Sequence, residues 1–207
     1  MNIQTIWPKN VGWLDVKLSD VEMNYLWDCC EDHRGDAKSD LAGNITNSQN
    51  IVDKDNWFWD NVLMGCLDVY TLSFGNLGFR FPTSKAHPYY LRSLWVNYQK
   101  ENEFNPRHNH INAIYSFVIW MKIPTKYEDQ KKLPIASGSN SNSISNFQFD
   151  YLDMLGKSNT HFYEMSPEME GTMLFFPSNL HHQVYPFYNC KEERISISGN
   201  IAVDTTQ

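Results

Sequence analysis

The segment RISISGNIAV, residues 194–203, alternates between apolar and polar side chains. Successive residues of a β-strand point to opposite faces of a sheet, so this alternation predicts a strand with two unlike faces. One face carries Ile195, Ile197, Gly199 and Ile201. The other face carries Arg194, Ser196, Ser198 and Asn200. If the isoleucines pack into the core, the polar face lines either open solvent or a polar cavity.

Five shorter runs with a strand-like pattern precede this segment. Pro, Gly and Asn residues separate them, and the runs cover 94–99, 114–123, 145–151, 172–176 and 182–187. Several short strands at this spacing are typical of a β-sandwich or a jelly roll. Residues 124–146 interrupt the pattern with a charged run and the low-complexity sequence SGSNSNS. We interpret them as a solvated insertion between two strands, which could also act as an active-site lid.

The first 93 residues show helical periodicity instead. Ser19 and Glu22 form the S-x-x-E capping-box pattern, which predicts a helix from about Ser19 to near Gly35. A second helical pattern, rich in aromatic residues, follows over 57–74. We therefore expect one α+β domain over residues 1–207, in which a helical N-terminal layer (1–93) packs on one sheet of a jelly-roll core (94–207).

Composition and charge exclude several classes of protein. At 207 residues the chain can bury a core without disulfide or metal staples. Its 17 Lys and Arg against 24 Asp and Glu give a net charge of −7, so duplex nucleic acid and anionic membrane surfaces are not expected partners. No apolar stretch approaches the roughly 20 residues that span a bilayer, and no signal-peptide pattern begins the chain, so we expect a cytoplasmic protein.

Two histidine clusters are the strongest candidates for chemistry. His108 and His110 are two residues apart, so on an extended chain both imidazoles point to the same side and can reach one ion. His182 precedes Arg194 by twelve residues, with a turn pattern between them, which predicts a hairpin that places both in one cavity. Imidazoles beside an arginine form a site that could bind a divalent metal together with an anionic co-substrate.

Three motifs carry a family resemblance: NPRHNH at 105–110, FPSNLHHQVYP at 176–186 and RISISGN at 194–200. Together they resemble the Fe(II)- and 2-oxoglutarate-dependent oxygenases, in particular a small, phage-type, prolyl-4-hydroxylase-like group. The resemblance covers residues 94–203. It implies a double-stranded β-helix, or jelly roll, with Fe(II) as the metal and 2-oxoglutarate and O₂ as co-substrates. The implied reaction is hydroxylation of a peptide or small molecule, with release of succinate and CO₂.

The resemblance also implies a role for each matching residue. His108 and His182 match two metal ligands, and His110, which stands where the family usually has a carboxylate, is expected to be the third. Arg194 matches the arginine that holds the distal carboxylate of 2-oxoglutarate, with Ser196 as its hydroxyl partner. Further contacts to the co-substrate are expected from Asn97, Tyr98 and Asn200. Trp95 and Trp120 are interpreted as packing residues.

Three other readings of the same residues stay open. A cupin shares the barrel and the histidines, but residues 111–115 lack the glutamate that its first motif requires. A zinc hydrolase needs a general base, and no Asp or Glu flanks either histidine cluster. A non-catalytic metal-binding or structural jelly roll is favoured by His110 in place of a carboxylate, and disfavoured by the retained Arg194.

Overall fold

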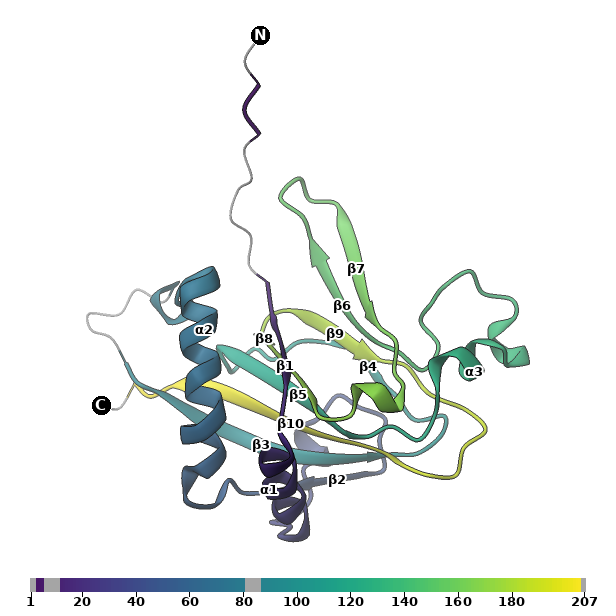
Figure 1. Cartoon of the computed structure of the whole chain (residues 1–207), viewed down its shortest axis with the longest axis horizontal. Coiled ribbons are helices and arrows are strands. Elements are labelled where there is room, and N and C mark those ends of the chain that lie inside the picture. The colour runs from purple at the N-terminus through teal and green to yellow at the C-terminus, as the bar shows by residue number, and fades with distance from the viewer. Residues whose placement is uncertain (1–2, 6–11, 81–86, 206–207) are drawn as a thin grey trace.

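The computed structural model describes residues 3–5, 12–80 and 87–205 (Figure 1). The helices are α1 (Asp20–Glu31), α2 (Met64–Phe74), which continues a π-helical turn (Trp59–Leu63), and α3 (Tyr127–Lys131). Short 3₁₀ turns cover Lys38–Asp40, Lys54–Asn56, Leu77–Arg80, Pro134–Ala136 and Pro167–Met169. Among these described residues, no helix is both long and apolar enough to cross a membrane.

The strands form two antiparallel sheets. They are β1 (Leu14–Lys17), β2 (Asn47–Asn50), β3 (Tyr89–Gln99), β4 (Asn105–His108), β5 (Tyr115–Lys122), β6 (Phe147–Leu152), β7 (Ser158–Tyr163), β8 (Thr172–Pro177), β9 (His181–Val184) and β10 (Arg194–Val203). The larger sheet has the order β1-β8-β5-β10-β3-β2, and the smaller has the order β4-β9-β6-β7. The strand predicted from the alternating segment, β10, therefore lies inside the larger sheet, between β3 and β5.

The larger sheet is covered on both faces, and β5 shows how. Phe117 and Ile119 belong to the apolar cluster shared with α1 and α2, while Val118 and Trp120 belong to a second cluster shared with the smaller sheet. Because alternate residues face two different apolar layers, seven of the eight residues of β5 are buried. Phe58, directly before the π-helical turn, contacts Phe117 of β5, with ring centroids 6.1 Å apart.

The alternation of β10 has the predicted consequence. Ile195, Ile197 and Ile201 join the helix-side cluster, so the polar residues face the space between the two sheets. Gly199 lies where a side chain has no room. A Cβ at this position would come within 2.4 Å of the Phe117 ring and 2.9 Å of the Ser93 carbonyl oxygen.

The N-terminal layer is not purely helical, in contrast to the prediction. Strand β1 pairs with β8 at one edge of the larger sheet, β2 pairs with β3 at the other edge, and β3 begins at Tyr89 rather than near 94. The two edge strands have only four residues each, and β2 reads Asn-Ser-Gln-Asn without apolar alternation. Such strands are formed by pairing with a neighbour, and four residues are too few for a periodic signal that distinguishes a strand from a loop.

The predicted hairpin between His182 and Arg194 is also wrong. Strand β9 pairs with β4 and β6 in the smaller sheet, whereas β10 pairs with β3 and β5 in the larger one. Residues 185–193 thus cross from one sheet to the other, and the fully buried Phe187 anchors this crossing in the core. The turn residues at 188–191 are compatible with a crossing between sheets as well as with a hairpin, so the sequence pattern does not distinguish the two.

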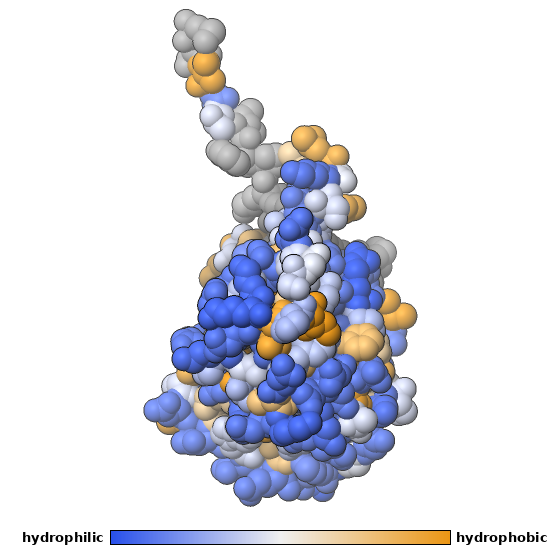
Figure 2. All heavy atoms as spheres, turned by 90° about the vertical axis from the view of Figure 1, so that its right-hand side faces the viewer, coloured by the Kyte–Doolittle hydropathy of each residue, from blue (hydrophilic) through white to orange (hydrophobic). Residues whose placement is uncertain are grey.

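Residues 124–146 are only partly a solvated insertion. Tyr127 and Gln130 of α3 are buried, and Gln130 exchanges two hydrogen bonds with the backbone of Tyr188 (2.8 and 2.9 Å). Ser145 and Asn146 have no exposed surface at all. The longest mostly exposed stretch is 131–142, on the side of the molecule that Figure 2 shows as mostly hydrophilic.

Replacing Gly199 with alanine tests how closely β10 packs on β5. We expect Gly199→Ala to lower the free energy of unfolding by about 1–3 kcal/mol, because the Phe117 ring and the backbone must shift to admit a methyl group. Urea denaturation measures the change. Gly65→Ala in α2 is the control, since its Cβ meets nothing within 4 Å, and we expect a gain of about 0.5–1 kcal/mol. Equal effects of the two variants would contradict the close packing.

Candidate metal and co-substrate site

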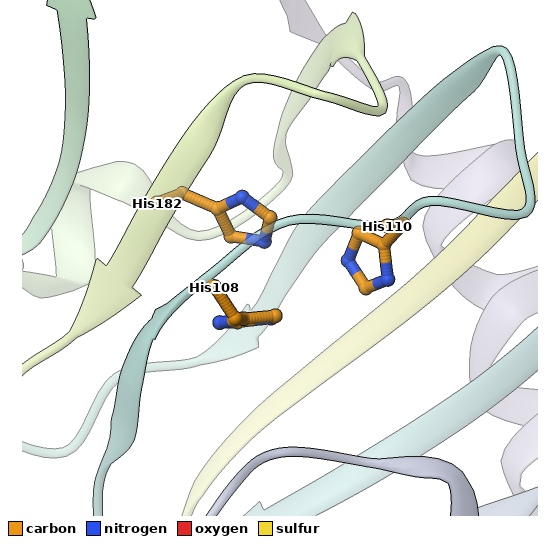
Figure 3. Close-up of side chains that lie close together, drawn as sticks. All are labelled: His108, His110 and His182. Atoms are coloured by element: carbon orange, nitrogen blue, oxygen red, sulfur yellow. The ribbon is translucent and has the colours of Figure 1, made fainter.

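Three histidines converge between the two sheets (Figure 3). His108 ends β4 and lies directly opposite His182 of β9 in the strand register, and His110 follows two residues later. Their ring centroids are 4.3 Å apart for His108 and His182, and 5.2 Å apart for each pair that includes His110. One nitrogen of each ring lies within 4.8 Å of the others, so all three can serve one ion.

Two different local structures position these rings. Strand pairing holds His108 and His182, as antiparallel pairing holds any two opposite residues. His110 lies beyond the end of β4, and its backbone N–H donates to the Ser178 carbonyl at 2.8 Å. His110 thus lies outside the strand, and its ring still points to the same centre as that of His108, so both imidazoles can reach one ion as expected.

Backbone carbonyls fix the tautomer of two of the rings. Nδ1 of His108 lies 2.7 Å from the Pro106 carbonyl, and Nδ1 of His182 lies 2.9 Å from the Leu180 carbonyl. A carbonyl oxygen only accepts hydrogen bonds, so each Nδ1 carries the proton and donates. The lone pair is then on Nε2, and the hydrogen bond sets the direction in which it points, as is usual for metal-binding histidines.

Burial keeps the three imidazoles neutral. Desolvation is the main cause in each case: it lowers the pKa of His182 well below its usual range, that of His110 to about 4, and that of His108 in the same direction. The charge of neighbouring histidines adds to the effect. At neutral pH all three nitrogens therefore have lone pairs available, as a divalent metal requires.

A cavity of about 110 Å³ adjoins the three rings. Two predicted co-substrate residues, Asn97 and Ser196, line it together with the triad. Trp95 and Trp120 also line it, as does a segment between Lys38 and Ser48 that sequence reasoning did not connect with the site. Within the described part of the chain, no Asp, no Glu and no residue of 124–146 lines this cavity. The proposed lid of residues 124–146 is thus not at this opening, and the cavity favours an anionic ligand.

Arg194 lies deeper in the protein, on the same face of β10 and two residues from Ser196. It is 1% exposed, and its Nη2 donates to the carbonyl (2.9 Å) and the hydroxyl (2.7 Å) of Ser145. Its guanidinium lies over the Phe187 ring, and its Nε has no hydrogen-bond partner. Burial lowers the pKa of Arg194 to about 9, which still leaves it charged at neutral pH. A buried cation with an unused donor fits an anionic ligand that reaches past Ser196.

The other predicted contacts lie in different places. Asn200 lines a neighbouring groove of about 430 Å³, where its side chain accepts a hydrogen bond from the Ser116 hydroxyl and donates one to the Ser93 hydroxyl. Trp95, Asn109 and His110 border both this groove and the cavity, so the groove leads to the metal site. Tyr98 packs with the helix-side cluster, on the opposite face of β3 from Asn97. It is therefore not brought to the site.

Ser145 is a site residue that the sequence did not indicate. It ends a polar, low-complexity stretch, where nothing distinguishes it from its neighbours. Its position at Arg194 follows from tertiary structure alone, since the two residues are 49 positions apart.

Comparison with known proteins identifies the family. Residues 93–200, just over half of the chain, match the family model for 2OG-Fe(II) oxygenases. The chain belongs to this family. Fe(II) is accordingly its metal, 2-oxoglutarate and O₂ are its co-substrates, and the three neutral imidazoles suit such a metal. No curated protein matches the chain by sequence.

Solved structures show a similar fold. A prolyl-4-hydroxylase from Pseudomonas putida has 15% identity and a TM-score of 0.53, with 93% of each chain covered. A viral collagen prolyl hydroxylase from Paramecium bursaria Chlorella virus-1, solved with 2-oxoglutarate, has 13% identity and a TM-score of 0.50, covering 92% of this chain and 96% of that one. SnoN, a non-heme α-ketoglutarate-dependent epimerase from nogalamycin biosynthesis, has 13% identity and a TM-score of 0.50, covering 93% and 76%.

Two of the three readings left open above are set aside. The cupin reading is set aside by the match over 93–200. The zinc hydrolase reading needs a carboxylate beside the metal, and none lies among the described residues around the cavity.

Removing His182 tests the metal site. We expect His182→Ala to weaken binding of Fe(II), measured anaerobically by calorimetry, by more than about 100-fold, because a ligand is lost outright. His181→Ala is the matched control, since this neighbour lines a groove on the other side of β9 and its variant should bind Fe(II) normally. Loss of binding in both variants, or in neither, would contradict the assignment.

Restoring a carboxylate tests whether His110 is a ligand. His110→Asp should still bind a metal and should shift its preference from Cu(II) toward Mn(II), because carboxylates favour harder ions than imidazoles do. Asn109→Asp adds the same charge next to the site and is the control for electrostatics alone. If both variants change metal preference equally in competition titrations, His110 is not a ligand.

Proposed function

We propose that the protein is an Fe(II)- and 2-oxoglutarate-dependent hydroxylase in which His108, His110 and His182 hold the metal. The observation that carries this proposal is the convergence of three neutral imidazoles on a cavity without carboxylates, with a buried arginine behind it. The two antiparallel sheets are then the two halves of a double-stranded β-helix, and the histidines that would hold the metal lie between them.

The proposed role of Arg194 is to hold the distal carboxylate of 2-oxoglutarate, with Ser196 as a second donor. Described residues provide no carboxylate partner for Arg194, and its Nε is unused. A carboxylate accepts two parallel hydrogen bonds from a guanidinium, and pairing offsets the cost of a buried cation. Asn97 lies opposite Ser196 in the register, but its amide oxygen already accepts a hydrogen bond from Ser48 (2.7 Å), so we assign it a supporting role.

The bound metal and its co-substrates supply the oxidising chemistry, with release of succinate and CO₂. The residues of this chain bind, orient and shield. The carbonyls of Pro106 and Leu180 fix the direction of two ligand rings. The aromatic side chains of Trp95, Trp120 and Phe147 exclude water from the cavity.

The substrate of this reaction is proposed to be a peptide or a small molecule that enters through the groove next to His110. Polar side chains line this groove: Asn50, Arg92, Ser93, Asn109, Asn112 and Asn200. The register between β3 and β10 skips Arg92 at a β-bulge, a feature common next to active sites. With a net charge of −7, the chain is not suited to bind duplex nucleic acid.

A second candidate is a non-catalytic metal-binding jelly roll. It is favoured by the all-histidine donor set, which lacks the carboxylate usual in the family. Anaerobic titration with Fe(II) and then 2-oxoglutarate separates the two candidates. A hydroxylase should develop the weak visible charge-transfer band expected of a keto acid chelated to Fe(II). A protein that binds Fe(II) without developing the band would be the second candidate.

Replacing Arg194 tests its proposed role directly. We expect Arg194→Gln to raise the dissociation constant for 2-oxoglutarate by at least about 100-fold while metal binding is kept, because a buried charge pair is lost. Arg107→Gln is the control: this arginine forms a half-exposed ion pair with Asp150 at 3.1 Å, away from the cavity. Unchanged affinity in Arg194→Gln would remove the arginine from the co-substrate site.

A further inference from the structure

One buried polar atom beside the cavity is left unexplained by packing. The side chain of Trp120 is 1% exposed, and its Nε1 has no hydrogen-bond partner. An indole N–H only donates, and leaving such a donor buried and unpaired costs about 1–3 kcal/mol. Trp13 provides the comparison, because its Nε1 donates to the Tyr163 hydroxyl at 2.8 Å. Trp120 was interpreted from the sequence as packing alone, which does not account for the unpaired nitrogen.

The position of Trp120 relates this donor to the co-substrate cavity. Trp120 lines the cavity together with the histidine triad, and it lies directly opposite Ser196 in the register of β5 and β10. Phe147 packs edge-on against its ring, with centroids 5.6 Å apart, and the carbonyl of Trp120 accepts the N–H of Gly171 at 2.8 Å. Both contacts hold the indole in place. In the pairing of β5 with β10, Met121 has no partner, because a β-bulge lies between Trp120 and Lys122.

Trp120 and Ser196 both line the cavity, and Arg194 is two residues from Ser196 on the same strand face. Nε1 of Trp120 and Nε of Arg194 are buried without a hydrogen-bond partner, and the hydroxyl of Ser196 is a third donor. Ser196 lies between the other two, opposite Trp120 and two residues from Arg194 on the same strand face. A group of donors without a neighbouring acceptor fits a ligand that only accepts hydrogen bonds, and a carboxylate is such a ligand.

We propose that the indole N–H of Trp120 donates a hydrogen bond to the distal carboxylate of 2-oxoglutarate. This inference rests on the proposed function, since it requires the co-substrate to lie between the triad and Arg194. Trp120 is then a binding residue that selects dicarboxylate keto acids over those that end in a methyl group. Because an indole does not titrate, its contribution is independent of pH.

The test uses Zn(II)-loaded protein, which binds the keto acid without turnover, and measures affinity by calorimetry. The two ligands are 2-oxoglutarate and 2-oxobutanoate, which share the chelating end and differ in the distal carboxylate. Trp120→Phe keeps an aromatic ring and removes the N–H. We expect it to weaken 2-oxoglutarate binding roughly 10- to 100-fold, the range for a hydrogen bond to a charged group, and to leave 2-oxobutanoate unchanged. Trp13→Phe is the control and should bind both ligands normally, since Trp13 lies outside the cavity.

Each other result overturns the inference in a distinguishable way. Equal weakening of both ligands means that Trp120 only shapes the cavity. Unchanged affinity for 2-oxoglutarate in Trp120→Phe means that the indole N–H of Trp120 does not contact the bound co-substrate. Failure of the wild-type, metal-loaded protein to bind 2-oxoglutarate removes the proposed function itself.

A measurement on the wild-type protein keeps the test valid if Trp120→Phe does not fold. In protein labelled with ¹⁵N at the indole nitrogen, the Trp120 signal can be assigned through its contacts with Phe147. We expect this signal to move downfield on addition of 2-oxoglutarate and to move much less with 2-oxobutanoate. The same small shift with both ligands would contradict a bond to the distal carboxylate.

Discussion

The pairing of β10 with both β3 and β5 is the constraint on which the site depends. Hydrogen bonds on both edges fix the register of this strand, and the register decides which side chains face the smaller sheet. A shift by one residue would place isoleucines in the cavity and bury Arg194 and Ser196 against the helices. Apolar packing on the helix side, where Ile197 and Ile201 have no exposed surface, makes such a shift costly. The polar interior of the protein is thus maintained by the apolar layer behind it.

The site combines three neutral imidazoles with an unbalanced positive charge. Desolvation keeps the histidines uncharged, and the nearby Arg194 stays a cation because its pKa of about 9 is still above neutral pH. In a chain with a net charge of −7, this local excess comes from Arg194 and from Lys38 in the cavity lining, where the described residues include no Asp or Glu. Such an arrangement favours binding of an anionic ligand next to the metal, and the interaction with the positive charge also orients that ligand.

Much of the fold and site followed from local pattern. Strand β10 is predicted to the residue, because its alternation is long and strict, and the six predicted strands all exist. The strands that were missed, β1, β2, β4 and β7, have four to six residues or a polar composition, so neighbouring strands define them. The crossing from β9 to β10 was taken for a hairpin because turn residues do not specify which sheet the next strand joins. The proposed roles of Trp120 and Ser145 depend on their neighbours in the folded chain. Trp120 lies opposite Ser196, and Ser145 is hydrogen-bonded to Arg194.

The strand order of the larger sheet determines when this sheet can be completed during synthesis. Its strands run β1-β8-β5-β10-β3-β2, so the strand that joins β3 to β5 is made after the other strands of the described residues. Until residue 203 has emerged, β3 and β5 lack the neighbour that aligns them, and the smaller sheet has no complete surface to pack on. Contacts between residues this far apart in sequence form slowly. The polar space between the two sheets therefore forms only after β10 has been made, although the three histidines beside it all precede β10 in the sequence.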